Sequence, residues 1–317
     1  DGSYVADGGL TISTVNEIVA RDTAEVYTAH TALKLNIYLG IIQRMSSSSN
    51  VLGTTVEDVV ASALQPVSDT VYVIAPSRDV VEAFIDFGAD ADGAPRVRIL
   101  SEESLLKDVL SDFLVASNAA ALVDDGVLDL RVTDDRFENT LLVTESSVVA
   151  VVAAGDHVAG LTTDDAAFVR SANETYTDSF EASEPFALRT PSISAVRDSL
   201  ESEFGADVRA DFDAVLESLR DADGKETTLD EVTVSLLVAA KHDVLLYDIS
   251  KWGEDVGVAS KATFSRTKTE LEDIGLIETE KVPIDVGRPR LRLRLGDDRL
   301  VEADVDQLAA VARDILE

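Results

Sequence analysis

Residues 260–295 read SKATFSRTKTELEDIGLIETEKVPIDVGRPRLRLRL, and this stretch decides the fold of the C-terminal part of the chain. Ser260 is a residue type preferred at helix N-caps, so we expect a helix over 261–274 directly after it. Gly275 is expected to end that helix, because glycine favours the left-handed C-cap conformation. The apolar residues expected to face inward along the helix are Phe264, Leu271 and Ile274.

Two further helices precede this one, and a strand pair follows it. Apolar spacing predicts helices over 229–240 and 243–252, with a glycine-containing turn over 253–257. Alternating residues predict strands over 276–282 and 290–295. Two helices joined by a short turn and followed by a strand pair predict a winged helix-turn-helix.

The charge balance changes across this unit. The whole chain carries 60 acidic and 27 basic residues, a net charge of −33, whereas residues 251–300 carry ten of each. Over 290–295 the leucines are expected to face the core and the arginines the solvent. A charged edge strand that resists aggregation is the alternative. Such a strand should be acidic on this protein, so the basic pattern favours DNA binding.

Groove geometry divides the predicted DNA contacts. Base edges are assigned to the exposed N-terminal part of the third helix, at Lys261, Thr263, Ser265 and Arg266. Lys251 is expected to touch phosphate, and the wing tip is expected to reach the backbone or the minor groove. The full predicted DNA-binding set is Lys251, Ser260, Lys261, Thr263, Ser265, Arg266, Lys268, Arg288, Arg290 and Arg292.

The overall composition is typical of haloarchaeal proteins. Acidic residues are in large excess, lysine is scarce, and the apolar side chains are small. A dense carboxylate surface keeps a protein hydrated in molar salt, where charge repulsion is screened within about 3 Å. Cysteine is absent, which excludes disulfides and thiolate zinc sites. No apolar run is long enough to span a bilayer, so we expect a cytoplasmic protein.

The residues before Met45 differ from the rest of the chain. Met45 is the only methionine, and residues 1–44 carry, per residue, less than half the net negative charge of the others. We expect translation to begin at Met45, with residues 1–44 an over-extended reading frame. A genuine N-terminal arm is the alternative, since residues 31–42 are compatible with a short helix or strand.

The residues between this segment and the winged helix alternate strands with helices, which predicts α/β layers. The expected strands are 71–75, 96–100, 127–132, 140–143, 148–153 and 157–161. The expected helices are 51–64, 79–87 ended by Gly88, one capped by Ser101 that runs through Leu114, and 164–180. A linker over 184–191, helices over 192–204 and 208–219 and a turn over 221–224 follow.

Longer motifs connect the chain to known families. Residues 260–266 and 271–277 resemble the recognition helix and first wing strand of archaeal and bacterial winged-helix repressors, although an apolar residue is usual at Lys268. We expect the methylene chain of Lys268 to pack against the core and its ammonium group to reach water. Residues 50–317 resemble the TbsP family of haloarchaeal transcription regulators through the strings at 251–264 and 284–292. This resemblance implies control of genes of central carbon and sugar metabolism.

The α/β part loosely resembles the phospholipase-D-like sensor domains of some archaeal winged-helix regulators. Catalysis in that superfamily needs a histidine, a lysine two residues later and an aspartate six residues later. After His157 these positions hold Ala159 and Thr163, so we expect a non-catalytic domain with His157 at a strand end. We expect no enzyme, no cofactor and no metal. The expected domains are a 1–44 extension, a 45–183 sensor domain, 184–225 linker and helices, and a 226–317 winged helix with a C-terminal helix.

The expected partners are double-stranded promoter DNA, a second copy of the chain and a small-molecule metabolite effector, with no membrane. Dimerisation is assigned to a terminal amphipathic helix over 305–316, whose wide apolar face is expected to pair with its twin. The chain is predicted to regulate transcription, as a repressor or an activator. The alternative is a protein-interaction module or scaffold built on a winged helix.

Overall fold

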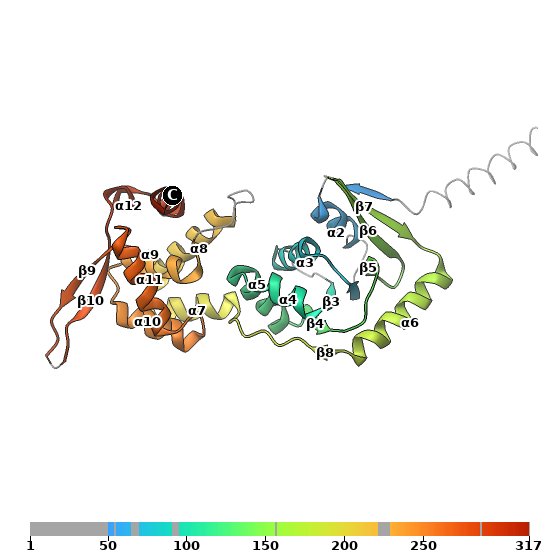
Figure 1. The fold of residues 1–317 in the computed structure, drawn as a ribbon, viewed down its shortest axis with the longest axis horizontal. Coiled ribbons are helices and arrows are strands. Elements are labelled where there is room, and N and C mark those ends of the chain that lie inside the picture. Colours follow the sequence, from blue (N-terminus) through green and yellow to red (C-terminus); the bar gives the residue numbers. More distant parts are fainter. Residues whose placement is uncertain are drawn as a thin grey trace, which may run out of the picture.

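The computed structural model describes residues 50–53, 55–64, 70–90, 95–155, 157–220, 229–285 and 287–316. The predictions for residues 1–44 and for the turn over 221–224 lie outside these ranges. Figure 1 shows an α/β domain and a mainly helical domain side by side, joined by an extended segment that runs beneath the α/β domain. The expected fold class, an α/β domain followed by a winged helix-turn-helix domain, is confirmed.

The first domain is built on one mixed sheet with strand order β1-β7-β6-β5-β2-β3-β4-β8. Its centre is parallel: β2 pairs with β3, and β3 with β4, while the other pairings are antiparallel. Parallel neighbours require crossover helices, which explains the alternation in the sequence. The strands are β1 Val51–Gly53, β2 Thr70–Ile74, β3 Arg96–Ser101, β4 Leu128–Val132, β5 Thr140–Val143, β6 Val148–Ala154, β7 His157–Thr163 and β8 Glu184–Pro185.

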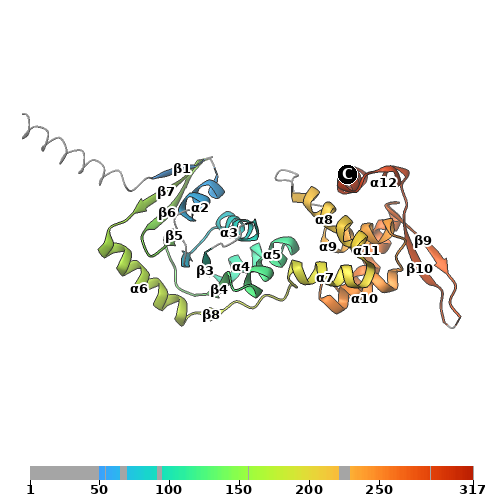
Figure 2. The same cartoon turned by 180° about the vertical axis from the view of Figure 1, so that it is seen from behind.

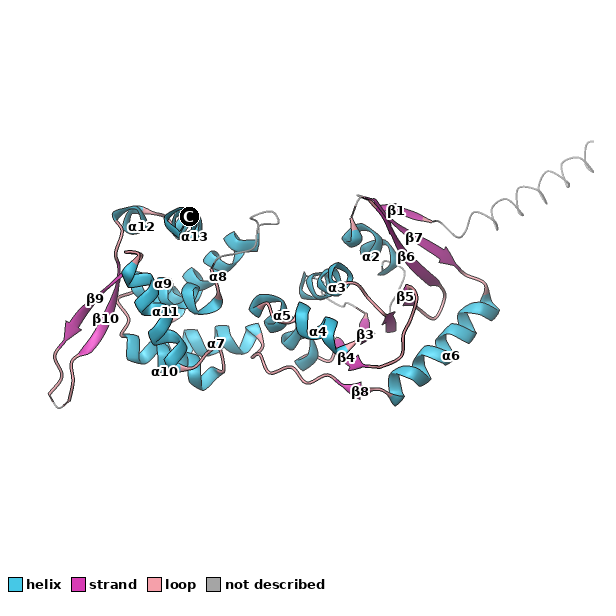
Figure 3. Cartoon of the chain, viewed as in Figure 1, coloured by secondary structure: helices cyan, strands magenta, loops and turns pink. Residues whose placement is uncertain are grey.

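Helices cover both faces of this sheet (Figure 3). One face packs against α2 Val56–Leu64, α3 Arg78–Asp90, α4 Glu103–Val109 and α5 Phe113–Asp124. The other face packs against α6 Ala166–Ala182 around Tyr72, Ile74 and Phe180. Because β2 is covered on both sides, it is a nearly continuous apolar run, whereas β4 alternates apolar and charged residues.

Three local predictions in this domain are wrong, two because a tertiary contact prevails and one because a local helix cap intervenes. Residues 51–53 form β1, which extends the sheet edge at β7, and the helix starts only at Val56. Gly88 lies inside α3, where an added Cβ would stand 2.9 Å from Leu122 Cδ1, so it permits close packing on α5. Ser101 ends β3, and the single helix expected after it is two, with Asp112 capping α5.

The helices and the hairpin of the second domain are grouped together in Figure 2. They surround a single apolar core. The core is shared by α7 and α8 with the helices and strands of the winged helix, so the segment after residue 192 packs as one unit. Its elements are α7 Ile193–Phe204, α8 Ala206–Arg220, α9 Glu231–Lys241, α10 Leu246–Val256, α11 Lys261–Asp273, β9 Ile277–Val282, β10 Arg290–Leu295, α12 Asp298–Glu302, η1 Val305–Gln307 and α13 Leu308–Leu316.

Three expectations in this domain are also corrected. The turn predicted to start at Gly253 starts at Gly257, because α10 continues to Val256. Ile274 is 46% exposed at the end of α11 and does not face inward. The apolar face of α13 packs against α8 in the same chain, with Leu308, Ala309 and Ala312 fully buried. It is therefore not free to pair with a twin.

The two domains meet where α5 packs on α7. Phe113 and Leu114 at the start of α5 pack against the core of the second domain. The buried Ser117 hydroxyl donates to the Pro191 carbonyl oxygen at 2.7 Å, which fixes the end of the connecting segment. A change of position in α5 would therefore reach the second domain directly.

An ion cluster joins α8 to the end of α9, and it gives a pH-dependent prediction. Asp211 accepts from Lys241 Nζ at 2.6 Å and lies 2.8 Å from His242 Nε2. Burial alone raises the pKa of Asp211, but the hydrogen bonds from Lys241 and His242 outweigh burial and hold the pKa below its usual value.

We expect Asp211→Asn to lower the free energy of unfolding by about 1–3 kcal/mol at neutral pH. A carboxyl group with a depressed pKa stabilises the fold above its unfolded pKa and loses that contribution as pH falls through the folded value. The difference between the variant and the wild type should therefore begin to narrow near about pH 4 and close only once the pH has fallen past the lowered folded pKa. Urea unfolding at stepwise lower pH measures it, and a gap independent of pH would contradict the assignment.

Candidate nucleic-acid interface

The crossing of α10 and α11 fixes the helix-turn-helix. Phe264 is fully buried beneath Gly253, where an added Cβ would lie 2.2 Å from Phe264 Cε2. Trp252 Nε1 donates to Ser199 Oγ at 3.0 Å, which ties α10 to α7. Because only a hydrogen atom fits at position 253, the contact between Gly253 and Phe264 sets the separation of α10 and α11.

The turn between these helices is formed by Gly257 and Ser260. Gly257 has φ +92°, a left-handed conformation that favours glycine. Ser260 Oγ accepts from the Thr263 N–H at 3.1 Å, as expected of an N-cap, and lies 2.9 Å from Thr263 Oγ1. The two hydroxyl groups are therefore engaged with each other at the start of α11.

The wing is the antiparallel hairpin β9–β10, in register from Arg290 opposite Val282 to Leu295 opposite Ile277. Gly275 before it has φ +79°, in agreement with the predicted C-cap. The Leu293 N–H donates to the Val244 carbonyl at 2.9 Å, so the segment before α10 is joined to the hairpin by a single isolated β-bridge. In Figures 1 and 2 the hairpin projects at the end of the molecule farthest from the α/β domain.

A groove of about 430 Å³ lies between the wing and the helices. Arg290 closes its base: the guanidinium lies 4.3 Å from the centre of the Tyr247 ring and donates to Asp248 Oδ1 at 3.1 Å. Four predicted DNA-binding residues meet in this lining, together with Tyr247, Ser250 and Ile284. They are Lys261, Ser265, Arg288 and Arg290.

The other predicted residues lie in different environments. Lys251, Ser260 and Arg266 are exposed outside the groove, and the Arg266 side chain is 71% accessible. Thr263 and Arg292 are half-buried, and among the described residues Arg292 Nε has no hydrogen-bond partner. The exposed set therefore extends from the start of α11 to the wing tip at Arg288.

Lys268 is not brought together with these residues. It is 9% exposed, and its Nζ donates to Glu272 Oε2 at 2.8 Å. Glu272 Oε1 also accepts from Thr279 Oγ1 at 2.6 Å, and the hydrogen bonds from Lys268 and Thr279 hold the Glu272 pKa below its usual value. Lys268 thus holds Glu272, the residue that links α11 to β9, and its ammonium group is not directed to the DNA-facing surface.

Carboxylates hold most of the exposed cations of this surface. Lys261 is ion-paired with Glu254, and Lys251 with Asp255. The hydrogen bond from Lys261 holds the pKa of Glu254 below its usual value. Among the described residues Arg288 has no ion-pair partner, so it is the cation most directly available to a phosphate. DNA has to displace a carboxylate to reach either lysine.

We expect Glu254→Gln to tighten DNA binding about two- to fivefold, because Lys261 is released and a carboxylate is removed from the path of the DNA. Glutamine keeps an acceptor for the Lys261 N–H, which lies 3.4 Å from Glu254 Oε1. Affinity titrations should show a larger gain at moderate than at molar salt. Glu302→Gln, which neutralises an exposed acid on α12, is the matched control. An equal gain in both variants would show that only net charge matters.

Sequence reasoning missed Tyr247 and Asp248, the α10 residues that hold Arg290. Tyr247 is 48% exposed on the polar face of α10. The sequence did contain a signal for Tyr247, because it places a large aromatic side chain on the helix face opposite the predicted core. The ion pair with Asp248 joins residues far apart in the chain, and no local pattern indicates it.

Metal binding, the histidine at residue 157 and membrane spans were the other features considered in the sequence. No group of three or more histidine or acidic side chains is placed to hold a metal ion there. His157 is exposed at the start of β7, as expected for a strand end. No helix within the described residues has the length and apolar content to cross a membrane.

Two family descriptions together span most of the chain. Residues 48–191 match the N-terminal part of a family described as transcriptional regulator TbsP-like, and residues 192–313 match its C-terminal HTH domain. No curated protein sequence matches the chain.

Similar solved structures are distant. TrmBL2, an archaeal chromatin protein whose structure shows a novel mode of DNA binding, is 14% identical with a TM-score of 0.30, over 55% of this chain and 69% of that one. The phospholipase D family member Nuc from Salmonella typhimurium is 14% identical with a TM-score of 0.32, over 44% and 97%. NucT from Helicobacter pylori is 13% identical with a TM-score of 0.29, over 44% and 99%. Similarities at this level carry no argument about function.

Proposed function

This chain belongs to the TbsP-like family of transcriptional regulators, and on that premise we propose that it binds specific promoter DNA through α11 and the wing. The observation that carries the proposal is the charge of this unit. In a chain of net charge −33, residues 251–300 are neutral, and the wing tip presents Arg288 without an ion-pair partner among the described residues.

The proposed DNA contacts differ in which part of the duplex they reach. Lys261, Ser265 and Arg266 at the exposed start of α11 read base edges in the major groove. Lys251 on α10 binds phosphate. Arg288 at the wing tip reaches the backbone or the minor groove, while Arg290 holds the wing against Tyr247 and Asp248. Ser260 caps the helix by accepting from the Thr263 N–H, and this pair sets the position of the first turn.

We extend this proposal to the genes that the protein regulates and to the cell in which it works. The family resemblance supports genes of central carbon or sugar metabolism, regulated in the cytoplasm of a haloarchaeon in response to a small-molecule metabolite. The acidic composition supports the salt-rich setting. We propose no catalytic role, since the lysine and the aspartate that phospholipase-D-like catalysis requires are absent after His157.

The test is selection of binding sites by the full chain from random duplex DNA in molar KCl, with a chromatin-binding map in the native host. The expected result is one recurring motif that is also occupied upstream of genes. Salt weakens phosphate contacts steeply, so sequence-independent binding should not survive molar KCl. Recovery of no motif, with a folded protein, would contradict the proposal and favour the protein-interaction alternative.

We also propose a homodimer, through a surface other than α13. Strands β6 and β7 contain no Asp, Glu, Lys or Arg. On the face opposite α2, Val152 is 42% and Leu161 48% exposed. Two chains that each carry a charge of −33 repel one another, so contact is favoured where neither presents carboxylates. A dimer would place two winged helices on half-sites about one helical turn apart.

We expect Val152→Asp and Leu161→Asp each to convert the dimer to a monomer at micromolar concentration, because the new carboxylate would lie opposite its own copy. Sedimentation velocity measures the change. Val301→Asp, at a 63% exposed valine on α12, is the control and should leave the dimer intact. A wild-type monomer that DNA does not alter would contradict the dimer.

A further inference from the structure

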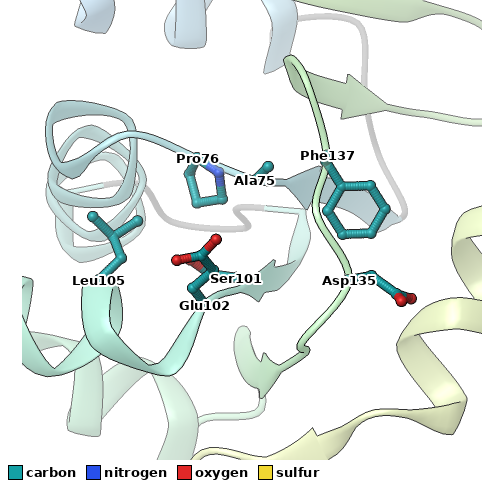
Figure 4. A pocket seen from close by; sticks show the side chains of 7 residues that line it. All are labelled: Ala75, Pro76, Ser101, Glu102, Leu105, Asp135 and Phe137. Atoms are coloured by element: carbon teal, nitrogen blue, oxygen red, sulfur yellow. The ribbon is translucent and has the colours of Figure 1, made fainter.

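A cavity of about 240 Å³ opens at the carboxyl ends of the parallel strands β2 and β3 (Figure 4). Ala75 and Pro76 follow β2, Ser101 ends β3, and Glu102 leads into α4. Phe137 lies across the cavity on the segment between β4 and β5. Ligands of open α/β sheets bind in crevices outside the carboxyl ends of strands, so this is where a ligand is expected.

The backbone at this edge is strained and held in place. Ala75 has φ +47°, a left-handed conformation that costs a residue other than glycine about 1–3 kcal/mol. Its N–H donates to the Leu100 carbonyl at 3.0 Å, and its own carbonyl accepts from Thr140 Oγ1 at 2.7 Å. Both bonds hold the strained residue at the cavity wall, and strain of this kind gathers at binding sites.

Ser101 supplies a second, independent observation. Its side chain is 2% exposed and lines the cavity, and within the described residues its hydroxyl forms no hydrogen bond. The hydroxyl is open to the cavity, where a hydrogen-bonding group of a ligand can take the place of water as its partner. The wall is thus incomplete as a hydrogen-bonding surface.

The charge of the residues that line the cavity indicates which class of ligand can bind there. It contains the carboxylates of Glu102 and Asp135 and no lysine, arginine or histidine, which disfavours anions. In Figure 4 the Glu102 carboxylate lies beside Ser101 at the centre, whereas that of Asp135 is turned outward at the rim. A neutral polyol would need donors from the protein, and Ser101 is the one side chain of the lining that can donate.

We propose that this cavity binds a small protonated primary amine. The ammonium group, which only donates, pairs with Glu102 and donates to Ser101 Oγ. The alkyl chain packs on Pro76, Leu105 and the Phe137 ring, which is held by an edge contact with Tyr176 at 6.0 Å between centroids. The volume lies below the roughly 300 Å³ at which drug-sized pockets begin, so the ligand is short.

A ligand in the cavity would contact elements that are connected, through α4 and α5, to the DNA-binding domain. Arg78 at the start of α3 is ion-paired with Asp108 of α4 at 2.7 Å, which joins the two helices that begin at the cavity. After α4 the chain enters α5, which packs on α7. We expect the amine to alter operator affinity by this route. That coupling rests on the proposed function, whereas the binding site does not.

Calorimetric titration of the full chain in molar KCl with butylamine and putrescine tests the site. The expected result is saturable binding of either amine and none of 4-aminobutyrate or glycerol. Glu102→Gln should weaken binding at least tenfold, and Ser101→Ala severalfold. Glu103→Gln is the matched control, because Glu103 pairs with Lys107 at 2.9 Å and does not line the cavity. Thermal melts verify that each variant folds.

No heat with either amine, equal binding of glycerol, or unchanged binding in Glu102→Gln would each overturn the site. Operator affinity with and without amine is measured separately. Amine binding that leaves operator affinity unchanged would overturn the coupling alone, whereas amine binding by a protein that recognises no operator would overturn the proposed function and leave the site standing.

Discussion

Gly253→Ala is expected to destabilise the DNA-binding domain by about 3 kcal/mol and to abolish operator binding. In a free helix the same change stabilises by about 1 kcal/mol, so the predicted effect has the opposite sign to the helix propensity. The reason is geometric: the new Cβ would lie 2.2 Å from Phe264 Cε2, inside a fully packed core. The helices α10 and α11 would have to separate, which displaces the DNA-reading surface.

A double-mutant cycle distinguishes this mechanism from a general loss of stability. Phe264→Ala alone should cost about 3–5 kcal/mol, because it leaves a cavity under α10. In Gly253→Ala/Phe264→Ala the methyl group enters the vacated space, so the total loss should be smaller than the sum of the single losses by about 2 kcal/mol or more. Urea unfolding measures all four proteins. Additive losses, or a Gly253→Ala protein as stable as the wild type, would contradict the contact.

Arg266→Ala is expected to cost about 1–3 kcal/mol in operator binding, roughly five- to 150-fold, and to relax specificity at one or two base pairs. Its side chain is 71% exposed, and Arg266 Nε lies 4.0 Å from Glu270 Oε1, so the guanidinium is free to reach a base edge. Long-range attraction does not assist a chain of net charge −33, and recognition therefore depends on such short-range contacts.

Arg288→Ala should instead weaken binding to all sequences to a similar extent, since a phosphate contact carries little sequence information. Arg290→Ala should act similarly, but by releasing the wing from Tyr247 and Asp248. Competition binding against randomised operators separates these patterns, and Arg136→Ala, on the exposed surface of the α/β domain, controls for loss of charge. If Arg266→Ala and Arg288→Ala both fold and keep full operator affinity, the DNA-binding surface lies elsewhere and the protein-interaction alternative takes the lead.

The sequence by itself determined those features that depend on neighbours along the chain. The N-cap at Ser260, the C-cap at Gly275 and the alternation over residues 290–295 predicted α11 and the wing, because caps and side-chain periodicity are local properties. The alternation of strands and helices likewise predicted the α/β layers. The enrichment of cations around the wing was also readable without a structure.

The tertiary structure decided what depends on residues far apart in the chain. Position 253 requires glycine because Phe264 lies beneath it, Lys268 donates to Glu272, which Thr279 of β9 also holds, and the face of α13 packs against α8. The cavity beside Ser101 likewise exists only because β2 and β3 end side by side. Local propensities amount to about 1 kcal/mol per residue or less, whereas clashes and buried contacts cost or contribute several, so the distant contact prevails wherever the two disagree.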